Sequence, residues 1–143
     1  MVAMRQLTMG ACVSQAISVF ARLGVADVLT AGPRDAEEIA QLVGAHSSAL
    51  YRLLRALGDV GVVTELGDRR FVLTSLGEVL RSDGSNSLRG WATMVGMPFH
   101  RYPWTDLYET VRTGESAFDR FAARRSSITW RSILRMRRYL MRQ

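Results

Sequence analysis

The first predicted helix, Met4 to Leu23, most constrains what this 143-residue chain can fold into. Its apolar residues surround the helix axis on more than one side instead of forming a single stripe. A helix that is apolar all round needs burial on several faces. In so small a chain a second subunit is the simplest cover, so the pattern predicts a homodimer. The candidate interface residues are Met4, Leu7, Met9, Val13, Ile17 and Phe20.

Two further helices are predicted in the middle of the chain. Asp35 and Glu38 have the spacing of a capping box, and Gly44 ends the helix that they begin. Ser47 or Ser48 then caps a second helix, and the preceding His46 is expected to help start it. The apolar residues of this second helix repeat at the spacing of one buried face: Leu50, Leu53, Leu54, Leu57 and Val60.

A predicted β-hairpin follows, with strands at Val62–Glu65 and Arg70–Leu73. Two short helices joined by a tight turn and followed by a hairpin form a winged helix-turn-helix. The predicted fold class is therefore mainly α, a winged helix-turn-helix with a small β-hairpin. Additional helices at the N-terminal and C-terminal ends are expected to serve dimerisation.

Short helices complete the predicted domain. Ser75 and Glu78 form another capping box, and Gly114 ends the last of these helices. Pro98 and Pro103 are predicted to break the helical pattern between them. The predicted helices are Val25–Leu29, Ser75–Leu80, Ser85 or Asn86 to about Met97, and about Trp104 to Arg112.

Charge divides the chain at residue 120. Residues 1–119 hold 11 arginines and all 13 acidic residues, a net charge of −2, whereas residues 120–143 hold eight arginines and no acid. We therefore predict a domain over 1–119 and an arginine-rich amphipathic tail over 120–143, with a helix at about 126–141. Such a helix covers an apolar groove, remains solvated, or lies on a membrane surface, the last being the less favoured partner.

The helix-turn-helix pattern raises a DNA-binding transcriptional regulator as the alternative function. The helix over Ser48–Val60 would be the recognition helix, with Arg69 and Arg70 near the wing. Residues 34–75, however, hold five arginines and six acidic residues, a net charge of −1. Because affinity for DNA comes largely from cationic contacts with phosphates, nucleic acid is not the favoured partner.

The sequence shows no motif for a nucleotide cofactor or a metal. None of the 12 glycines belongs to a GxGxG or GxxxxGK[ST] loop. Neither His46 nor His100 has a second ligand at metal spacing, and the single cysteine, Cys12, cannot form an internal disulfide. We therefore predict no catalytic, cofactor-binding or metal-binding residue. The lack of a signal pattern or of a membrane-spanning apolar run predicts a cytoplasmic protein.

A set of short segments, in order between residues 7 and 119, carries a family resemblance. The segments are Ser14–Ala16, Ala21–Leu29, Gly32–Arg34, Ala36–Ala40, Leu50–Leu57, Gly61–Val62, Phe71–Thr74, Leu76–Asp83, Ser87–Gly90, Trp104–Leu107 and Arg112–Asp119. Together they resemble the N-terminal region of SAM-dependent O-methyltransferases, in particular the bacterial branch that methylates polyketide aglycones and related aromatics.

The resemblance implies a winged-helix domain that intertwines with the same domain of a second subunit. It also implies that the helices after the wing line part of an acceptor pocket, which by position makes Met97, His100 and Trp104 a substrate-pocket remnant. Family members continue beyond the region of Phe118 into a Rossmann-like domain with a SAM loop and a catalytic histidine. This sequence departs from the family after Phe121.

An altered reading frame, a truncated gene or a divergent short paralogue would each produce such a departure. We therefore expect a homodimerisation module of an O-methyltransferase-like protein that lacks the SAM-binding catalytic domain. On this interpretation the chain alone binds no cofactor, although full-length family members use SAM, and it has no activity of its own.

Overall fold

The computed structural model describes residues 2–124, so the helix predicted for about residues 126–141 lies outside the described residues. The chain divides between Thr93 and Met94 into two compact units.

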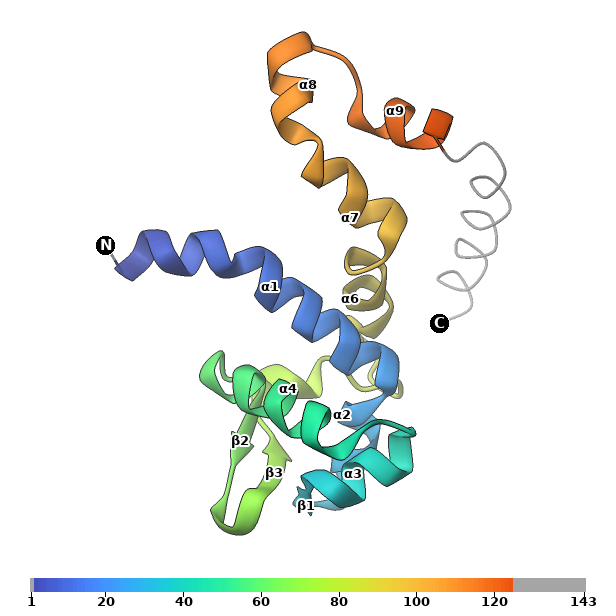
Figure 1. The fold of residues 1–143 in the computed structure, drawn as a ribbon. Helices are drawn as coiled ribbons and strands as arrows, with labels where there is room; N and C mark the ends of the chain where they lie inside the picture. Colours follow the sequence, from blue (N-terminus) through green and yellow to red (C-terminus); the bar gives the residue numbers. More distant parts are fainter. Residues whose placement is uncertain (1, 125–143) are drawn as a thin grey trace. The chain divides into compact units, whose positions relative to one another are not determined.

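The first unit is a helical body closed by a small sheet (Figure 1). Its helices are α1 (Val2–Leu23), α2 (Val25–Val28), α3 (Ala36–Val43), α4 (Ser47–Asp59), α5 (Ser75–Glu78) and most of α6 (Arg89–Val95), with a short 3-10 turn, η1 (Leu29–Ala31), after α2. Its strands are β1 (Arg34–Asp35), β2 (Val63–Glu65) and β3 (Arg70–Leu73), and the 3-10 turn η2 (Gly67–Arg69) forms the hairpin tip. The predicted mainly α, winged helix-turn-helix fold is confirmed.

The core of this unit lies where the C-terminal half of α1 meets α3, α4 and the sheet. Its largest fully buried side chains are Phe20, Val25, Ile39, Leu54, Leu57, Val63 and Phe71. Fully burying a Val, Leu, Ile or Phe side chain contributes about 1.5–3 kcal/mol. The predicted buried face of α4 is confirmed at Leu50, Leu54 and Leu57, whereas Val60 is partly exposed because the chain has left the helix there.

Side-chain caps begin α3 and α4. Asp35 accepts hydrogen bonds from the amides of Glu37 and Glu38 at 2.9 and 2.8 Å, which confirms it as the cap of α3. The reciprocal half of the predicted capping box is wrong, because the Glu38 carboxylate pairs with Arg34 instead. α4 is capped by His46, whose Nδ1 accepts from the Ala49 amide at 3.4 Å, so the prediction of a serine cap is also wrong.

The sheet contains one more strand than the sequence predicts. β2 and β3 form the expected hairpin, and β1 pairs with the other edge of β3 to give the antiparallel order β1-β3-β2. β1 is only two residues long, too short for an alternating pattern to reveal it. The Arg70 guanidinium supports this edge by donating to the Pro33 carbonyl at 2.7 Å.

Thr74 caps α5, whereas the sequence pointed to Ser75, its neighbour. The Thr74 hydroxyl accepts from the Gly77 amide at 3.1 Å and donates toward the Gly61 carbonyl at 2.6 Å. α6 begins at Arg89, later than predicted from Ser85 or Asn86.

The second unit contains α7 (Pro98–Thr105), α8 (Leu107–Thr113) and α9 (Ala117–Arg124). The predicted break at Pro98 separates α6 from α7, but α7 itself was not predicted. Pro103 lies inside α7, so the predicted break there is wrong, and the helix predicted from about Trp104 begins at Leu107 instead. Gly114, in the left-handed conformation with φ 76°, ends α8 as predicted. α9 runs across residues 119 and 120, where the change in net charge placed the predicted boundary. A change in charge does not end a helix, because a helix end requires a backbone signal.

Within residues 2–124 no single helix is long and apolar enough to cross a bilayer. α1 and Val25–Ala31 together have the length and apolar composition of a membrane span, but the two segments are bent by 58° relative to each other. Phe20, Ala21, Val25 and Ala26 of that pair are buried in the core of the first unit.

Candidate functional site

The N-terminal half of α1 carries an apolar surface that the first unit does not cover. Every residue from 2 to 12 is exposed, and Figure 1 shows this half of the helix extending away from the rest of the unit. Met4 and Leu7 expose 65% and 75% of their surface, and Met9 exposes 55%. The structure therefore places three of the six predicted interface residues in solvent.

The other three interface residues lie nearer the core. Val13 and Ile17 are half-buried. Phe20 is fully buried among the side chains of its own chain, so it has no surface left to offer a second subunit. Its place in the predicted interface is corrected to a core position, because α1 enters the helical body before that residue.

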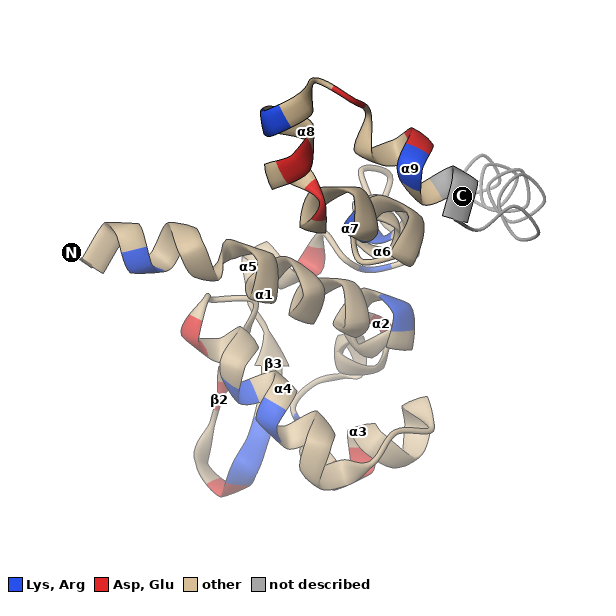
Figure 2. Cartoon of the chain, turned by 45° about the horizontal axis from the view of Figure 1, so that its top comes forward, with Lys and Arg blue, Asp and Glu red and all other residues tan. Residues whose placement is uncertain are grey.

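Electrostatics set this surface apart from the rest of the domain. Figure 2 shows a single basic turn and no acidic residue on the outer half of α1. That basic residue is Arg5, and the first carboxylate in the sequence is Asp27. An apolar surface with one charge is poorly suited to water and well suited to packing against another apolar surface.

Polar contacts fix the inner end of α1. The buried Ser18 hydroxyl donates to the Thr93 carbonyl at 3.1 Å. Arg89 donates to the Ala21 carbonyl at 3.1 Å and forms an ion pair with Asp27 at 2.9 Å. These contacts hold the inner end, so the outer half of the helix is presented in a defined direction from the first unit.

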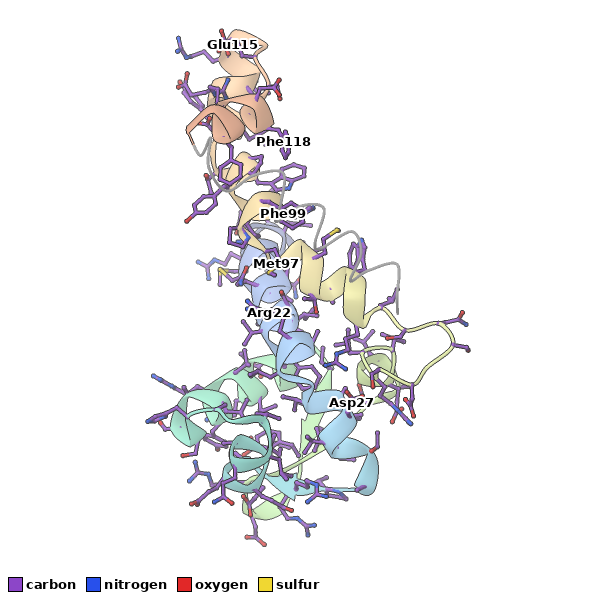
Figure 3. The ribbon with its side chains drawn as sticks, turned by 90° about the vertical axis from the view of Figure 1, so that its right-hand side faces the viewer. Arg22, Asp27, Met97, Phe99, Glu115 and Phe118 are labelled. Carbon is purple, nitrogen blue, oxygen red and sulfur yellow. The ribbon has the colours of Figure 1, made fainter. Side chains whose placement is uncertain are left out.

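The three predicted pocket residues lie close together on the second unit. Met97 is half-buried at the start of α7 (Figure 3), and its carbonyl accepts from the His100 amide at 3.0 Å. His100 Nδ1 lies 3.1 Å from the Val95 carbonyl oxygen, which can only accept, so Nδ1 is the donor in this contact. The Trp104 ring lies 6.4 Å from the His100 ring and is 63% exposed.

A polar hollow of about 530 Å³ lies on the first unit between α3, α4 and the hairpin tip. Its lining residues are Asp35, Ala36, Glu37, Ser47, Ser48, Asp68 and Arg69. Asp35 is occupied in capping α3, and the Arg69 guanidinium lies over the Tyr51 ring at 4.1 Å. Small-molecule sites are mostly apolar, so this charged hollow does not fit an aromatic acceptor. Among the described residues, no group of three or more His, Cys, Asp or Glu side chains could hold a metal ion.

Sequence reasoning missed a second exposed apolar set. Leu107, Tyr108 and Val111 on α8 are exposed and follow Trp104 at helical spacing. The signal is present in the sequence as an i, i+3, i+4, i+7 pattern that starts at Trp104. The helix predicted from about Trp104 to Arg112 contains all four positions, but periodicity alone does not show whether an apolar helix face is covered or exposed.

The fold and the exposed helix define a class of protein, a winged-helix domain with an uncovered apolar helix. The sequence profile of the O-methyltransferase dimerisation domain matches residues 5–83. The chain therefore belongs to the O-methyltransferase dimerisation domain family.

Individual relatives agree with this assignment. The chain is 42% identical to O-methyltransferase SfmM3 of Streptomyces lavendulae over 117 residues, which are 82% of this chain and 35% of the relative. The phenazine O-methyltransferase PhzM of Lysobacter antibioticus is 38% identical over 80% of this chain and 33% of its own length. The chain thus spans about a third of the length of these curated relatives.

A solved structure shares the fold. The crystal structure of LaPhzM matches with a TM-score of 0.83 at 33% identity, covering 99% of this chain and 41% of that protein.

Proposed function

We propose that this chain is a homodimerisation module in which two copies associate through the outer half of α1. The observation that carries this proposal is the exposure of Met4, Leu7 and Met9 on a helix segment whose only charge is Arg5. Large contiguous apolar patches are uncommon on monomers and mark sites of association. A closed two-fold interface would bury each of these side chains twice, once on each subunit.

The half-buried residues of α1 support the same arrangement. Val13 and Ile17 lie between the exposed outer half and the fully buried Phe20, so the apolar surface runs without interruption into the core. A second copy packed along α1 would extend the core of the first unit across the two-fold axis. The proposed interface is therefore Met4, Leu7, Met9, Val13 and Ile17.

The methyl-transfer chemistry belongs, on this proposal, to the parts of such proteins that this chain does not match. The relatives are methyltransferases, and the matched region is about a third of their length. We infer that SAM is the cofactor of the family and that this chain alone neither binds it nor transfers a methyl group.

Met97, His100 and Trp104 keep a secondary place in the proposal as a contribution to an acceptor pocket. Trp104 exposes most of its ring and is suited to packing against an aromatic acceptor. His100 retains Nε2 for a polar group of such a ligand, since Nδ1 is held by the Val95 carbonyl. Together they fit a binding role better than a catalytic one.

The alternative of a DNA-binding regulator is not favoured. Four of the five arginines between residues 34 and 75 are engaged within the domain: Arg34 with Glu38, Arg55 with Glu65, Arg69 with Tyr51, and Arg70 with Pro33. Binding to a duplex would require them to leave these partners for phosphates.

Co-purification of two differently tagged copies tests the proposed interface. We expect the unmodified copies to co-purify and Leu7→Asp to abolish the association. Burial of one Leu contributes about 1.5–3 kcal/mol, and the two-fold axis doubles the effect, so Kd should rise by at least about 100-fold.

The matched control is Gln6→Asp, which adds the same charge to the neighbouring exposed position. It should leave the association within a few-fold of the unmodified chain. Equal association of the Leu7→Asp variant and the unmodified chain would contradict the assignment of this surface.

A further inference from the structure

The first unit carries a further exposed apolar surface, which we name the α5–α6 patch. It consists of two pairs of side chains, Leu76 with Val79 and Leu88 with Trp91. Each pair is separated by one helical turn, the first pair at α5 and the second at the start of α6. The Leu88 amide donates to the Val79 carbonyl at 2.7 Å, so the two pairs are neighbours. Trp91 and Leu76 expose 62% and 55% of their surface, and the patch is therefore open to solvent.

The outer half of α1 does not cover this patch within one chain. Residues 2–12 are all exposed, and so are the four residues of the patch. The inner end of α1 is held to α6 by the contacts of Ser18 and Arg89, which keep the straight helix from folding back. Two exposed apolar surfaces of the same compact unit can therefore meet only between two copies.

The outer half of α1 alone is small for a stable interface. Its well-exposed large apolar side chains are Val2, Met4, Leu7 and Met9. Burial of a side chain of this size removes roughly 100 Å² from water, so these residues supply about 400 Å². Stable protein interfaces bury about 800 Å² on each partner. The α5–α6 patch, which also has four large apolar side chains, supplies about the missing area.

The charges near the two surfaces are opposite in sign. Arg5 is the only charged residue among residues 2–12, and it belongs to none of the ion pairs formed within residues 2–124. Beside the patch, Arg81 pairs with Glu78 and with Asp83, each at 2.7 Å. This cluster of one arginine and two carboxylates has one excess negative charge. A helix with a single unpaired arginine is complementary to such a surface.

We propose that the outer half of α1 of one copy docks on the α5–α6 patch of a second copy. The contact is reciprocal, so the two-fold axis makes it twice and no apolar surface of either element is left over. Arg5 then lies toward the carboxylates of Glu78 and Asp83 on the other copy. This inference rests on the proposed homodimer and names the surface that receives α1.

Photo-crosslinking between two distinguishable copies tests the proposal directly. In one tagged copy Met9 is replaced by the photoreactive amino acid p-benzoylphenylalanine. The other copy is unmodified, carries a second tag and is labelled with heavy nitrogen. Trypsin cuts after arginine, so the patch is divided among peptides 71–81, 82–89 and 90–101. We expect the peptide that contains position 9 to be joined to heavy peptides of this set, at Leu76, Val79, Leu88 or Trp91.

The matched control places the photoreactive amino acid at Leu42 on α3, which is 58% exposed in the same unit. It should give at least about fivefold less cross-linking between copies. If the tagged copies co-purify but position 9 is joined to heavy peptide 6–22 or 102–112, the patch is overturned while the homodimer stands. If the copies do not co-purify, the homodimer and this inference are both overturned.

Substitutions in the patch supply a second readout. Trp91→Asp should raise the Kd of self-association at least about tenfold, because a large apolar side chain leaves the interface. Leu76→Asp, in the other pair of the patch, should do the same and serves if the first variant does not fold. Leu42→Asp adds the same charge outside the patch and should leave Kd within a few-fold. An unchanged Kd in a folded patch variant would overturn the proposal.

Discussion

At the scale of single residues, Gly77 shows how one backbone position holds the hairpin to α5. A Cβ atom at this position would overlap the carbonyl oxygen of Val62 and crowd the Leu73 side chain. We predict that Gly77→Ala destabilises the first unit by about 1–3 kcal/mol, because backbone must move to relieve the overlap. Gly67→Ala is the matched control, since a Cβ atom at that position would meet no other atom within 4 Å. Thermal unfolding should separate the two variants, and equal Tm values would refute the steric explanation.

The residue scale also shows why capping residues are hard to assign from sequence. His46, Ser47 and Ser48 are adjacent polar residues, as are Thr74 and Ser75, and each could accept from an amide two or three positions later. The residue that caps the helix is the one with an extended backbone, His46 for α4 and Thr74 for α5. Which neighbour adopts that conformation depends on how the preceding segment packs in the folded domain. Sequence therefore located both helix starts within two residues but not their caps.

A cap prediction follows for α5. Thr74→Ala should lower the stability of the first unit by about 1 kcal/mol or more, because the Gly77 amide loses its acceptor and two carbonyl contacts are lost. Ser75→Ala, one residue later, should change stability by a few tenths of a kcal/mol at most. Chemical denaturation of the two variants measures the difference, and the reverse order would restore Ser75 as the cap.

At the scale of elements, most of the first unit could be predicted from periodicity. The all-round apolar pattern gave α1, the i, i+3, i+4 spacing gave α4, and the paired strands gave the hairpin. β1 was not predicted because its two residues are too few to show the alternation of apolar and polar side chains that marks a strand. Sequence also could not divide α1 into a buried inner half and an exposed outer half, since both halves are equally apolar.

The candidate site was predicted only in outline. Met4, Leu7 and Met9 are exposed as an interface requires, whereas Phe20 is buried in the core of its own chain. The exposure of Trp104, Leu107, Tyr108 and Val111 was missed because periodicity shows an apolar face but not whether another element covers it. The break predicted at Pro103 is a separate error, since α7 continues through that residue and ends at Thr105. Loss of one backbone donor near the end of a helix is tolerated when other contacts hold the element, and Tyr102 stacking on Phe121 is one such contact here.

At the scale of the whole molecule, the proposed separation of assembly from chemistry predicts how the chain responds to cofactor. Titration of the chain with SAM should give no saturable heat, because an adenosyl cofactor needs a concave site with placed polar groups. The polar hollow beside α3 and α4 offers carboxylates to a sulfonium but little apolar surface to an adenine ring. Saturable heat with a micromolar Kd would contradict the proposal that this chain alone does not bind SAM.

The central claim is that the outer half of α1 brings two copies together. Sedimentation equilibrium of the unmodified chain at micromolar concentration tests it most directly, because one chain has a mass of 16.0 kDa and a dimer has twice that mass. We predict the doubled mass, with the Leu7→Asp variant returning to the mass of a single chain. A single-chain mass for the unmodified protein across the micromolar range would contradict the account.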